Sequence, residues 1–88
     1  MFIILYYDVG EARCSKMLKQ CRAYLQWVQN SVFEGEISLA SYEELIYKLK
    51  EIMDEDSGDS IVVYKFRTLR YTERIVFGQD KKGDFKFI

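Results

Sequence analysis

The first eight residues restrict most strongly what this chain can fold into. Seven apolar or aromatic residues, Met1 to Tyr7, follow one another without a turn residue and end at the carboxylate of Asp8. Such a run predicts a strand over Phe2–Tyr7 that is covered on both faces. Val9 and Gly10 then lead into a basic segment, so Asp8 lies where a strand ends and a loop begins. Functional groups are often positioned at such places on a rigid scaffold.

Hydrophobic periodicity predicts two helices and several further strands. Apolar residues recur at helical spacing over Glu11–Leu25 and again from Ser41 to Met53. Ser41 or Ser38 is expected to cap the second helix. Segments rich in β-formers predict the strands. The strands expected after Phe2–Tyr7 are Gln26–Gln29, Val32–Ile37, Ser60–Phe66 and Thr72–Phe77, with a last short strand at about 84–88.

This order of elements predicts an α+β domain of the ferredoxin-like βαββαβ type, with additional C-terminal strands. Eighty-eight residues suit one small domain, 1–88. Both helices of such a domain lie on one face of the sheet, so the apolar first strand needs a cover on its other face. A second copy of the chain is the simplest cover, which predicts a homodimer with its sheets facing each other. The strand at about 84–88 is expected to pair with the partner protomer.

Composition removes several classes of site. The chain contains no histidine, which excludes histidine-based triads, histidine zinc ligands and an imidazole base. Cys14 and Cys21 are two helical turns apart, about 10 Å, which is too far for a disulfide, so both are expected to be core thiols. The sequence shows no secretory signal and no long apolar span. We therefore expect a cytoplasmic protein without membrane contact.

Charge is segregated along the chain although the net charge is only −1. Residues 1–33 carry a charge of +2, residues 34–60 carry −7 and residues 61–88 carry +4. The acidic middle could simply be a solvated helix face and loop. Alternatively, the two basic ends could fold into one surface for a polyanion, with the acidic segment facing away.

Two segments together resemble a known family. Tyr7-Asp8-Val9 ends the first strand, and Trp27-Val28-Gln29-Asn30-Ser31-Val32-Phe33-Glu34-Gly35-Glu36 follows the basic helix. With the strand Ile61–Phe66, these segments resemble the Cas-two family of CRISPR-associated proteins over essentially the whole chain. The resemblance implies a ferredoxin-like homodimer that acts in CRISPR adaptation, where it bridges the Cas-one integrase and holds prespacer DNA. It also implies a metal-dependent endonuclease on RNA or DNA, whose catalytic metal ligand corresponds to Asp8.

One carboxylate is a poor site for Mg²⁺, which prefers octahedral oxygen ligation and keeps several waters. A two-fold axis beside Asp8 would supply a second carboxylate from the partner chain. A Mg²⁺ or Mn²⁺ ion held there would provide the nucleophile that a chain without histidine needs. The structural alternative for Asp8 is a cap or turn residue ahead of the first helix.

The resemblance implies a part in activity for Ser31 and Phe33. Their structural alternatives are a turn hydroxyl for Ser31 and a core or dimer-packing ring for Phe33. Basic residues form two further groups that could bind phosphates independently of sequence, or could merely be solvated. These groups are Arg13, Lys16, Lys19 and Arg22 on the first helix, and Lys65, Arg67 and Arg70 at and beyond the end of the strand Ser60–Phe66.

The sequence therefore favours a nucleic-acid-binding homodimer with Mg²⁺-dependent endonuclease activity. Two other functions stay open. The first is a non-catalytic scaffold that bridges the Cas-one integrase and holds prespacer DNA. The second is a toxin-type small ribonuclease with no integrase partner.

Overall fold

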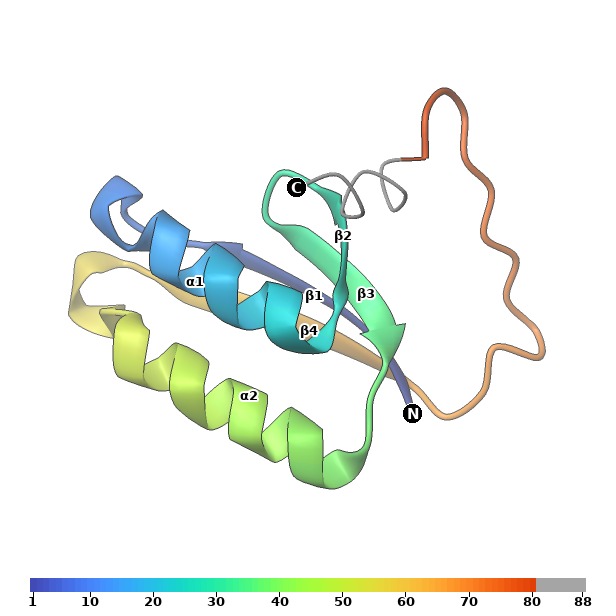
Figure 1. Ribbon diagram of the computed structural model, residues 1–88, viewed down its shortest axis with the longest axis horizontal. Coiled ribbons are helices and arrows are strands. Elements are labelled where there is room, and N and C mark those ends of the chain that lie inside the picture. The colour runs from blue at the N-terminus through green and yellow to red at the C-terminus, as the bar shows by residue number, and fades with distance from the viewer. Residues whose placement is uncertain (81–88) are drawn as a thin grey trace.

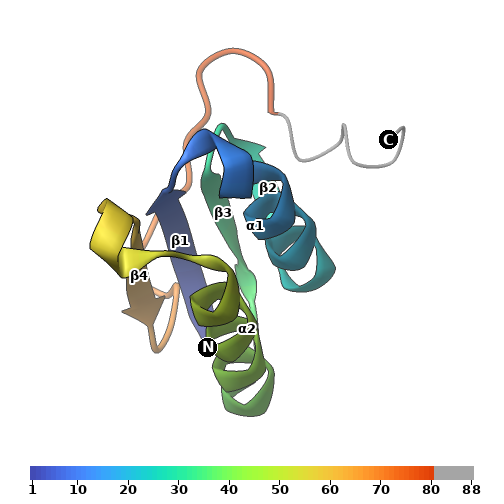
Figure 2. The same cartoon turned by 90° about the vertical axis from the view of Figure 1, so that its left-hand side faces the viewer.

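The computed structural model describes residues 1–80 and has the predicted βαββαβ order. Its four strands form one antiparallel sheet in the order β2-β3-β1-β4, and both helices lie on one side of it (Figures 1 and 2). The ferredoxin-like α+β prediction is therefore confirmed. The elements are β1 (Phe2–Asp8), α1 (Glu11–Tyr24), β2 (Gln26–Gln29), β3 (Val32–Glu36), α2 (Leu39–Ile52), the short 3-10 helix η1 (Glu55–Ser57) and β4 (Ser60–Phe66).

The central strand β1 divides the molecule into two sides. Ile3, Leu5 and Tyr7 are buried beneath the helices, whereas Phe2, Ile4, Tyr6 and Asp8 alternate with them and face the opposite side. We call this opposite side the open face, because neither α1 nor α2 covers it (Figure 2). The apolar first strand is thus covered by helices on one side only.

The core lies between the sheet and the two helices. Met17 and Cys21 from α1 and Leu45 and Leu49 from α2 are completely buried, as is Phe33 from β3. The four helix residues belong to the apolar stripes that the sequence predicts for the two helices. Burial raises the pKa of the Cys21 thiol to about 12, so Cys21 is a neutral core residue. Within residues 1–80, neither helix is both long and apolar enough to cross a bilayer.

Local chemistry sets where the elements begin and turn. Ser38, not Ser41, caps α2, because its Oγ accepts a hydrogen bond from the Ser41 N–H at 3.1 Å. The β2–β3 hairpin turns at Asn30, whose φ of 47° lies in the left-handed region that asparagine tolerates. The Trp27 indole N–H donates to the Asn30 carbonyl oxygen at 2.9 Å and ties the hairpin together.

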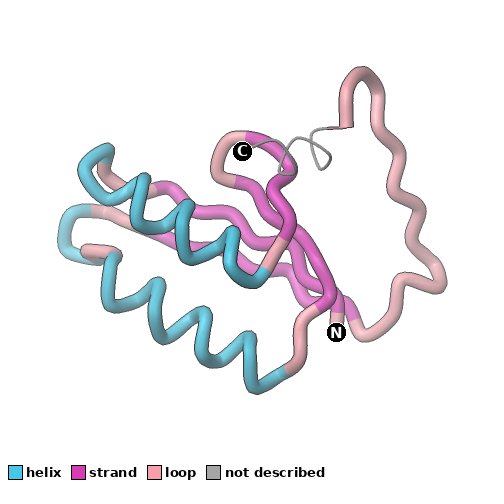
Figure 3. The backbone as a smooth tube through the Cα atoms, in the orientation of Figure 1, coloured by secondary structure: helices cyan, strands magenta, loops and turns pink. Residues whose placement is uncertain are grey.

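The predicted strand Thr72–Phe77 is wrong. These residues pair with no strand among residues 1–80 and belong to the long loop that follows β4 (Figure 3). Residues that favour β-structure predicted the strand, but a strand also needs a neighbouring edge to pair with. The strand predicted at about 84–88 lies outside the described residues.

Two leucines of α2 test the packing. Leu49 is completely buried and Leu39 is 61% exposed. We expect Leu49→Ala to lower the free energy of unfolding by about 2–5 kcal/mol, because the substitution removes core contacts and leaves a cavity. Leu39→Ala should change it by less than about 0.5 kcal/mol. Urea unfolding followed by circular dichroism measures both, and equal losses would contradict this packing.

Candidate active site and nucleic-acid interface

Asp8 is the last residue of β1 and lies on the open face. Its register partner is Ser60, the first residue of β4, and the β2–β3 turn reaches the same end of the sheet. Asp8 is exposed, and among residues 1–80 its side chain has no hydrogen bond or ion pair. A carboxylate in this position is available to a ligand that approaches the open face.

Asp8 does not cap α1. The N-cap position belongs to Gly10, and no side-chain hydrogen bond caps this helix. The structural alternative that the sequence left for Asp8 as a helix cap is therefore absent. Within residues 1–80 no three acidic or cysteine side chains come together as a metal site. One protomer thus contributes a single carboxylate at this place.

A buried carboxylate, Asp59, fixes the loop that follows Asp8. Its Oδ1 accepts hydrogen bonds from the Gly10 N–H and Arg13 Nη2, both at 2.9 Å. Its Oδ2 accepts from Arg13 Nε at 2.5 Å and from the Asp54 N–H at 2.8 Å. The Arg13 guanidinium, followed by these two backbone donors, holds the pKa of the Asp59 carboxyl well below its usual value. Asp59 therefore stays ionised at physiological pH.

Ser31 lies at the same end of the sheet as Asp8 but its hydroxyl is directed elsewhere. The Tyr7 N–H donates to the Ser31 carbonyl oxygen at 3.3 Å, and the two side-chain hydroxyls also hydrogen-bond. Burial raises the pKa of the Tyr7 phenol to about 12, and the contact with Ser31 offsets part of this rise. Because Tyr7 is on the helix-covered side, Ser31 contacts the core and Asp8 faces away from it.

Phe33 belongs to the core. Its side chain is completely buried and stacks on Tyr7 with a centroid distance of 6.3 Å and an angle of 20° between the rings. A ring in this position cannot touch a substrate without unfolding of the sheet. Any part that Phe33 plays in the site is therefore to support Tyr7, the residue before Asp8.

The basic residues of α1 divide into two kinds. Arg13 is half-buried and binds Asp59, so its guanidinium is already used within the protein. Lys16, Lys19 and Arg22 are exposed, and Lys19 and Arg22 border a shallow groove of about 390 Å³ on the helix surface. These three residues form the basic surface of α1 and are spaced by one helical turn, which suits contacts with successive phosphates.

The second basic group lies at the opposite end of the sheet. β1 spans about 20 Å, and its register places Phe66 opposite Phe2, the end farthest from Asp8. Lys65 Nζ lies 4.4 Å from the centroid of the Tyr42 ring. Arg70 lies 5.7 Å from the Tyr71 ring, and Arg67 is exposed. In one protomer the structure therefore does not place this group beside Asp8.

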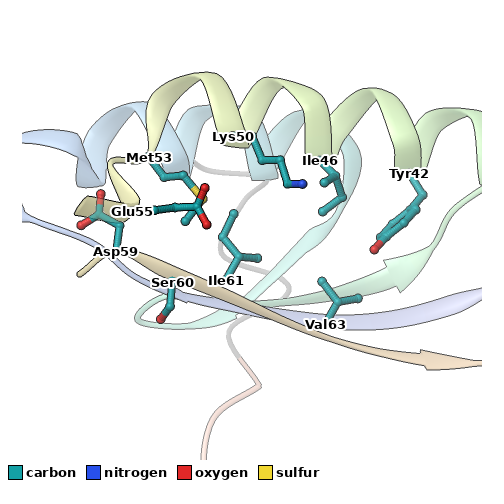
Figure 4. Close-up of a pocket in the computed structure, with 9 residues that line it drawn as sticks. All are labelled: Tyr42, Ile46, Lys50, Met53, Glu55, Asp59, Ser60, Ile61 and Val63. Atoms are coloured by element: carbon teal, nitrogen blue, oxygen red, sulfur yellow. The ribbon is translucent and has the colours of Figure 1, made fainter. Parts of the chain in front are cut away.

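Two hollows of the surface differ in character. The pocket of about 390 Å³ in Figure 4 lies between α2 and β4, on the helix-covered side, and Asp8 does not border it. A smaller apolar pocket of about 250 Å³ lies on the open face, where Phe2, Ile4 and Phe66 meet the loop after β4. Arg74 ties that loop to buried Glu34 on β3 with an Nε to Oε1 distance of 2.5 Å. The apolar pocket of the open face thus lies beside Glu34, at the end of the sheet away from Asp8.

Known proteins place this architecture in a family. The family model described as CRISPR associated protein Cas2 matches residues 1–74. The chain belongs to this family. A protein of Pyrococcus furiosus named CRISPR-associated endoribonuclease Cas2 is 51% identical over 69 residues, which cover 78% of this chain and 80% of the relative. A protein of Dictyoglomus turgidum with the same name is 43% identical over 81 residues, 92% of each chain.

Solved structures of this family have the same fold. A structure titled as a crystal structure of Cas2 is 43% identical and superposes with a TM-score of 0.79, covering 92% of this chain and 90% of the other. The Cas2 of Streptococcus pyogenes is 30% identical and gives a TM-score of 0.73, with 88% of this chain and all of the other covered. The family resemblance inferred from Asp8 and the Gln29–Gly35 segment is confirmed.

Sequence reasoning missed Asp59, although it fixes the loop after the candidate ligand of this Cas2-family chain. Asp59 is one of several acidic residues between α2 and β4, and no local pattern separates it from Asp54 or Asp56. The one available signal is its place directly before an apolar strand, two residues ahead of Ile61. Its partners Gly10 and Arg13 are more than 40 residues away, so only the fold reveals the contact.

Proposed function

We propose that this chain is a divalent-metal-dependent endoribonuclease that works as a homodimer, with Asp8 from each protomer holding a shared Mg²⁺ or Mn²⁺ ion. The main observation behind the proposal is that the Asp8 carboxylate is exposed on the open face and does not cap α1. Relatives up to 51% identical are named endoribonucleases, which supports RNA as the substrate. The absence of histidine excludes an imidazole base and favours metal-assisted hydrolysis.

The residues fit a magnesium or manganese ion of this kind. Carboxylate oxygen is the ligand that hard cations prefer, and Mg²⁺ is commonly held by one or two carboxylates with water and phosphate completing its shell. Two Asp8 side chains related by a two-fold axis would supply these carboxylates. The ion, when bound, would activate a water and stabilise charge on the phosphate. Asp8 holds and orients the ion, while Tyr7 and Cys21, both neutral, take no proton.

The basic surface of α1, Lys16, Lys19 and Arg22, is proposed to bind the phosphate backbone. All three side chains are exposed on one helix. Phosphate contacts of this type do not depend on base identity, and they weaken as salt rises because counterions are released. Lys65, Arg67 and Arg70 are proposed to extend the contact to the far end of the sheet. We expect this binding to show little sequence preference.

A scaffold function is the second candidate. A single carboxylate per protomer makes a weak metal site, whereas the exposed basic surface does not depend on metal. On this proposal the homodimer holds duplex prespacer DNA and bridges the Cas-one integrase, and Asp8 is not required. A toxin-type ribonuclease without an integrase partner would share the nuclease chemistry but not the integrase contact.

Asp8→Asn tests the nuclease. We expect the variant to lose cleavage of labelled single-stranded RNA by about 100-fold or more, because the amide keeps the shape of the carboxylate but not the charge that holds the ion. Wild-type cleavage should need Mg²⁺ or Mn²⁺ and stop when the ion is chelated. Its rate should rise with pH and should not show the bell-shaped pH profile that a histidine base would give. Gel assays of RNA and duplex DNA, with and without chelator, measure these effects.

Asp56→Asn is the matched control, because Asp56 is exposed and lies in η1, outside the proposed site. It should cleave as wild type does. Undiminished cleavage by Asp8→Asn would rule out the paired-Asp8 centre. If neither protein cleaves while both bind duplex DNA and the integrase, the scaffold function replaces the nuclease.

Charge reversal tests the basic surface of α1. We expect Lys16→Glu with Lys19→Glu to weaken RNA binding by about tenfold or more and to reduce the slope of log affinity against log salt by about 1.4, since two phosphate contacts are lost. Lys48→Glu with Lys50→Glu on α2 is the control and should have a smaller effect. Arg13 is left unchanged, because its reversal would break the Asp59 pair. Fluorescence anisotropy at several salt concentrations measures both, and equal losses would refute this surface.

The homodimer is tested on the open face. Tyr64 is 54% exposed there, and its ring lies 6.4 Å from that of Tyr6. We expect wild type to sediment as a dimer at micromolar concentration and Tyr64→Asp to sediment as a monomer, because a charge would be buried between two apolar faces. Tyr47→Asp is the control, since Tyr47 is 66% exposed on α2. A folded wild-type monomer would contradict the proposed dimer.

A further inference from the structure

We propose that Asp59 is a positioning residue for Asp8: its buried carboxylate fixes the β1–α1 loop against the start of β4 and so sets where the Asp8 carboxylate stands. This inference rests on the proposed nuclease, for which the position of Asp8 matters. It also predicts a rigid loop that can be measured without any activity.

The geometry of Asp59 is that of a buried junction. Its side chain is only 2% exposed, and each oxygen accepts two N–H donors. The donors come from the loop after β1 (Gly10), the first turn of α1 (Arg13) and the turn before β4 (Asp54). A carboxylate is the only side-chain group of this size that can accept four such bonds and donate none. The three segments are therefore joined through one residue.

Gly10 is part of the same arrangement. A Cβ built on Gly10 would lie 2.6 Å from Arg13 Nη2 and 3.1 Å from its Cζ. Side chains normally yield to such contacts, but Arg13 is held by Asp59 through both Nε and Nη2. The absence of a side chain at position 10 lets the guanidinium lie against the loop. Lysine could not replace Arg13 here, because an ammonium does not offer two donors in a fixed fork.

Asp8 depends on this junction because nothing within the described protomer holds its own side chain. Its position is set by its backbone, which lies two residues before Gly10 and pairs with Ser60, the neighbour of Asp59. Asp59, directly before β4, is thus tied to the loop that directly follows β1, and these are the two strands that meet at Asp8. An ion shared by two chains demands that each carboxylate stand in the same place, and catalytic geometry tolerates displacements of only about half an ångström.

The test compares Asp59→Asn, Arg13→Lys and Gly10→Ala with wild type in the full chain. In Asp59→Asn the new amide NH₂ faces two N–H donors whichever oxygen it replaces. We expect kcat for single-stranded RNA to fall about 10- to 100-fold and the half-saturating Mn²⁺ concentration to rise, with KM for RNA unchanged. Gly10→Ala keeps all charges and should produce the same pattern. Ser38→Ala, which removes the α2 cap at the far end of the domain, is the control for general destabilisation.

Amide hydrogen exchange at Gly10 provides the readout that is independent of activity. Exchange should be about tenfold faster in Asp59→Asn and Arg13→Lys than in wild type, and unchanged in Ser38→Ala.

If Asp59→Asn remains folded with wild-type kcat, Mn²⁺ dependence and Gly10 exchange, Asp59 is not a positioning residue, and the nuclease proposal still stands. If Arg13→Lys raises KM alone, Arg13 binds phosphate and the inference is overturned. If wild type itself shows no metal-dependent cleavage, the nuclease proposal fails. Gly10 exchange then decides, since an unchanged rate in Asp59→Asn refutes the junction.

Discussion

β1 presents Ile3, Leu5 and Tyr7 to the helices while its alternate residues face the other way. Among residues 1–80, the two α-helices complete a core on one side of the sheet and leave aromatic surface on the other. The cross-strand pair Tyr6 and Tyr64, with ring centroids 6.4 Å apart, is exposed on that open face, two residues along β1 from Asp8. The same alternation turns Asp8 outward. The uncovered apolar surface and the exposed carboxylate therefore share one cause, and a partner seated on the first would also meet the second.

The fold was predictable where local pattern and tertiary contact agree. The helical spacing of Met17 and Cys21 predicts α1, and the uninterrupted apolar run at the N-terminus predicts β1. Both patterns are local and do not depend on the rest of the chain. The start of α2 was ambiguous from sequence, because Ser41 has Glu44 three residues on, while Ser38 is a second serine that could cap the helix. The structure selects Ser38, whose Oγ accepts from the Ser41 N–H. Thr72–Phe77 shows where pattern fails. Its residues favour a strand, but a strand exists only beside an edge, and edges are set by distant parts of the chain.

The candidate site divides in the same way. Asp8 could be found because its position, at the end of a buried strand, is itself a sequence feature. Asp59 could not, because its partners are brought to it only by the crossing of β1, α1 and β4. Arg13 shows that helical spacing alone does not identify a phosphate-binding residue. It has the same spacing as Lys16 and Lys19, yet its guanidinium binds the buried carboxylate of Asp59. In the acidic turn after α2, the Asp54 carboxylate accepts from the Asp56 N–H and the Ser57 hydroxyl, and the Asp54 backbone N–H donates to Asp59.

The proposed centre, in which each chain would contribute one carboxylate to a shared ion, has an unusual requirement. In most metal sites neighbouring ligands and their hydrogen-bond partners orient each other. Here the side chain of Asp8 has no such support among residues 1–80. Precision must then come from the backbone, and a buried, ionised carboxylate that joins three segments is an effective way to obtain it, because its burial is stable only while all its donors remain in place. The internal pairing of Arg13 is on this argument not a loss of nucleic-acid contact. On the proposed function, it is how a small domain would keep Asp8 in one position.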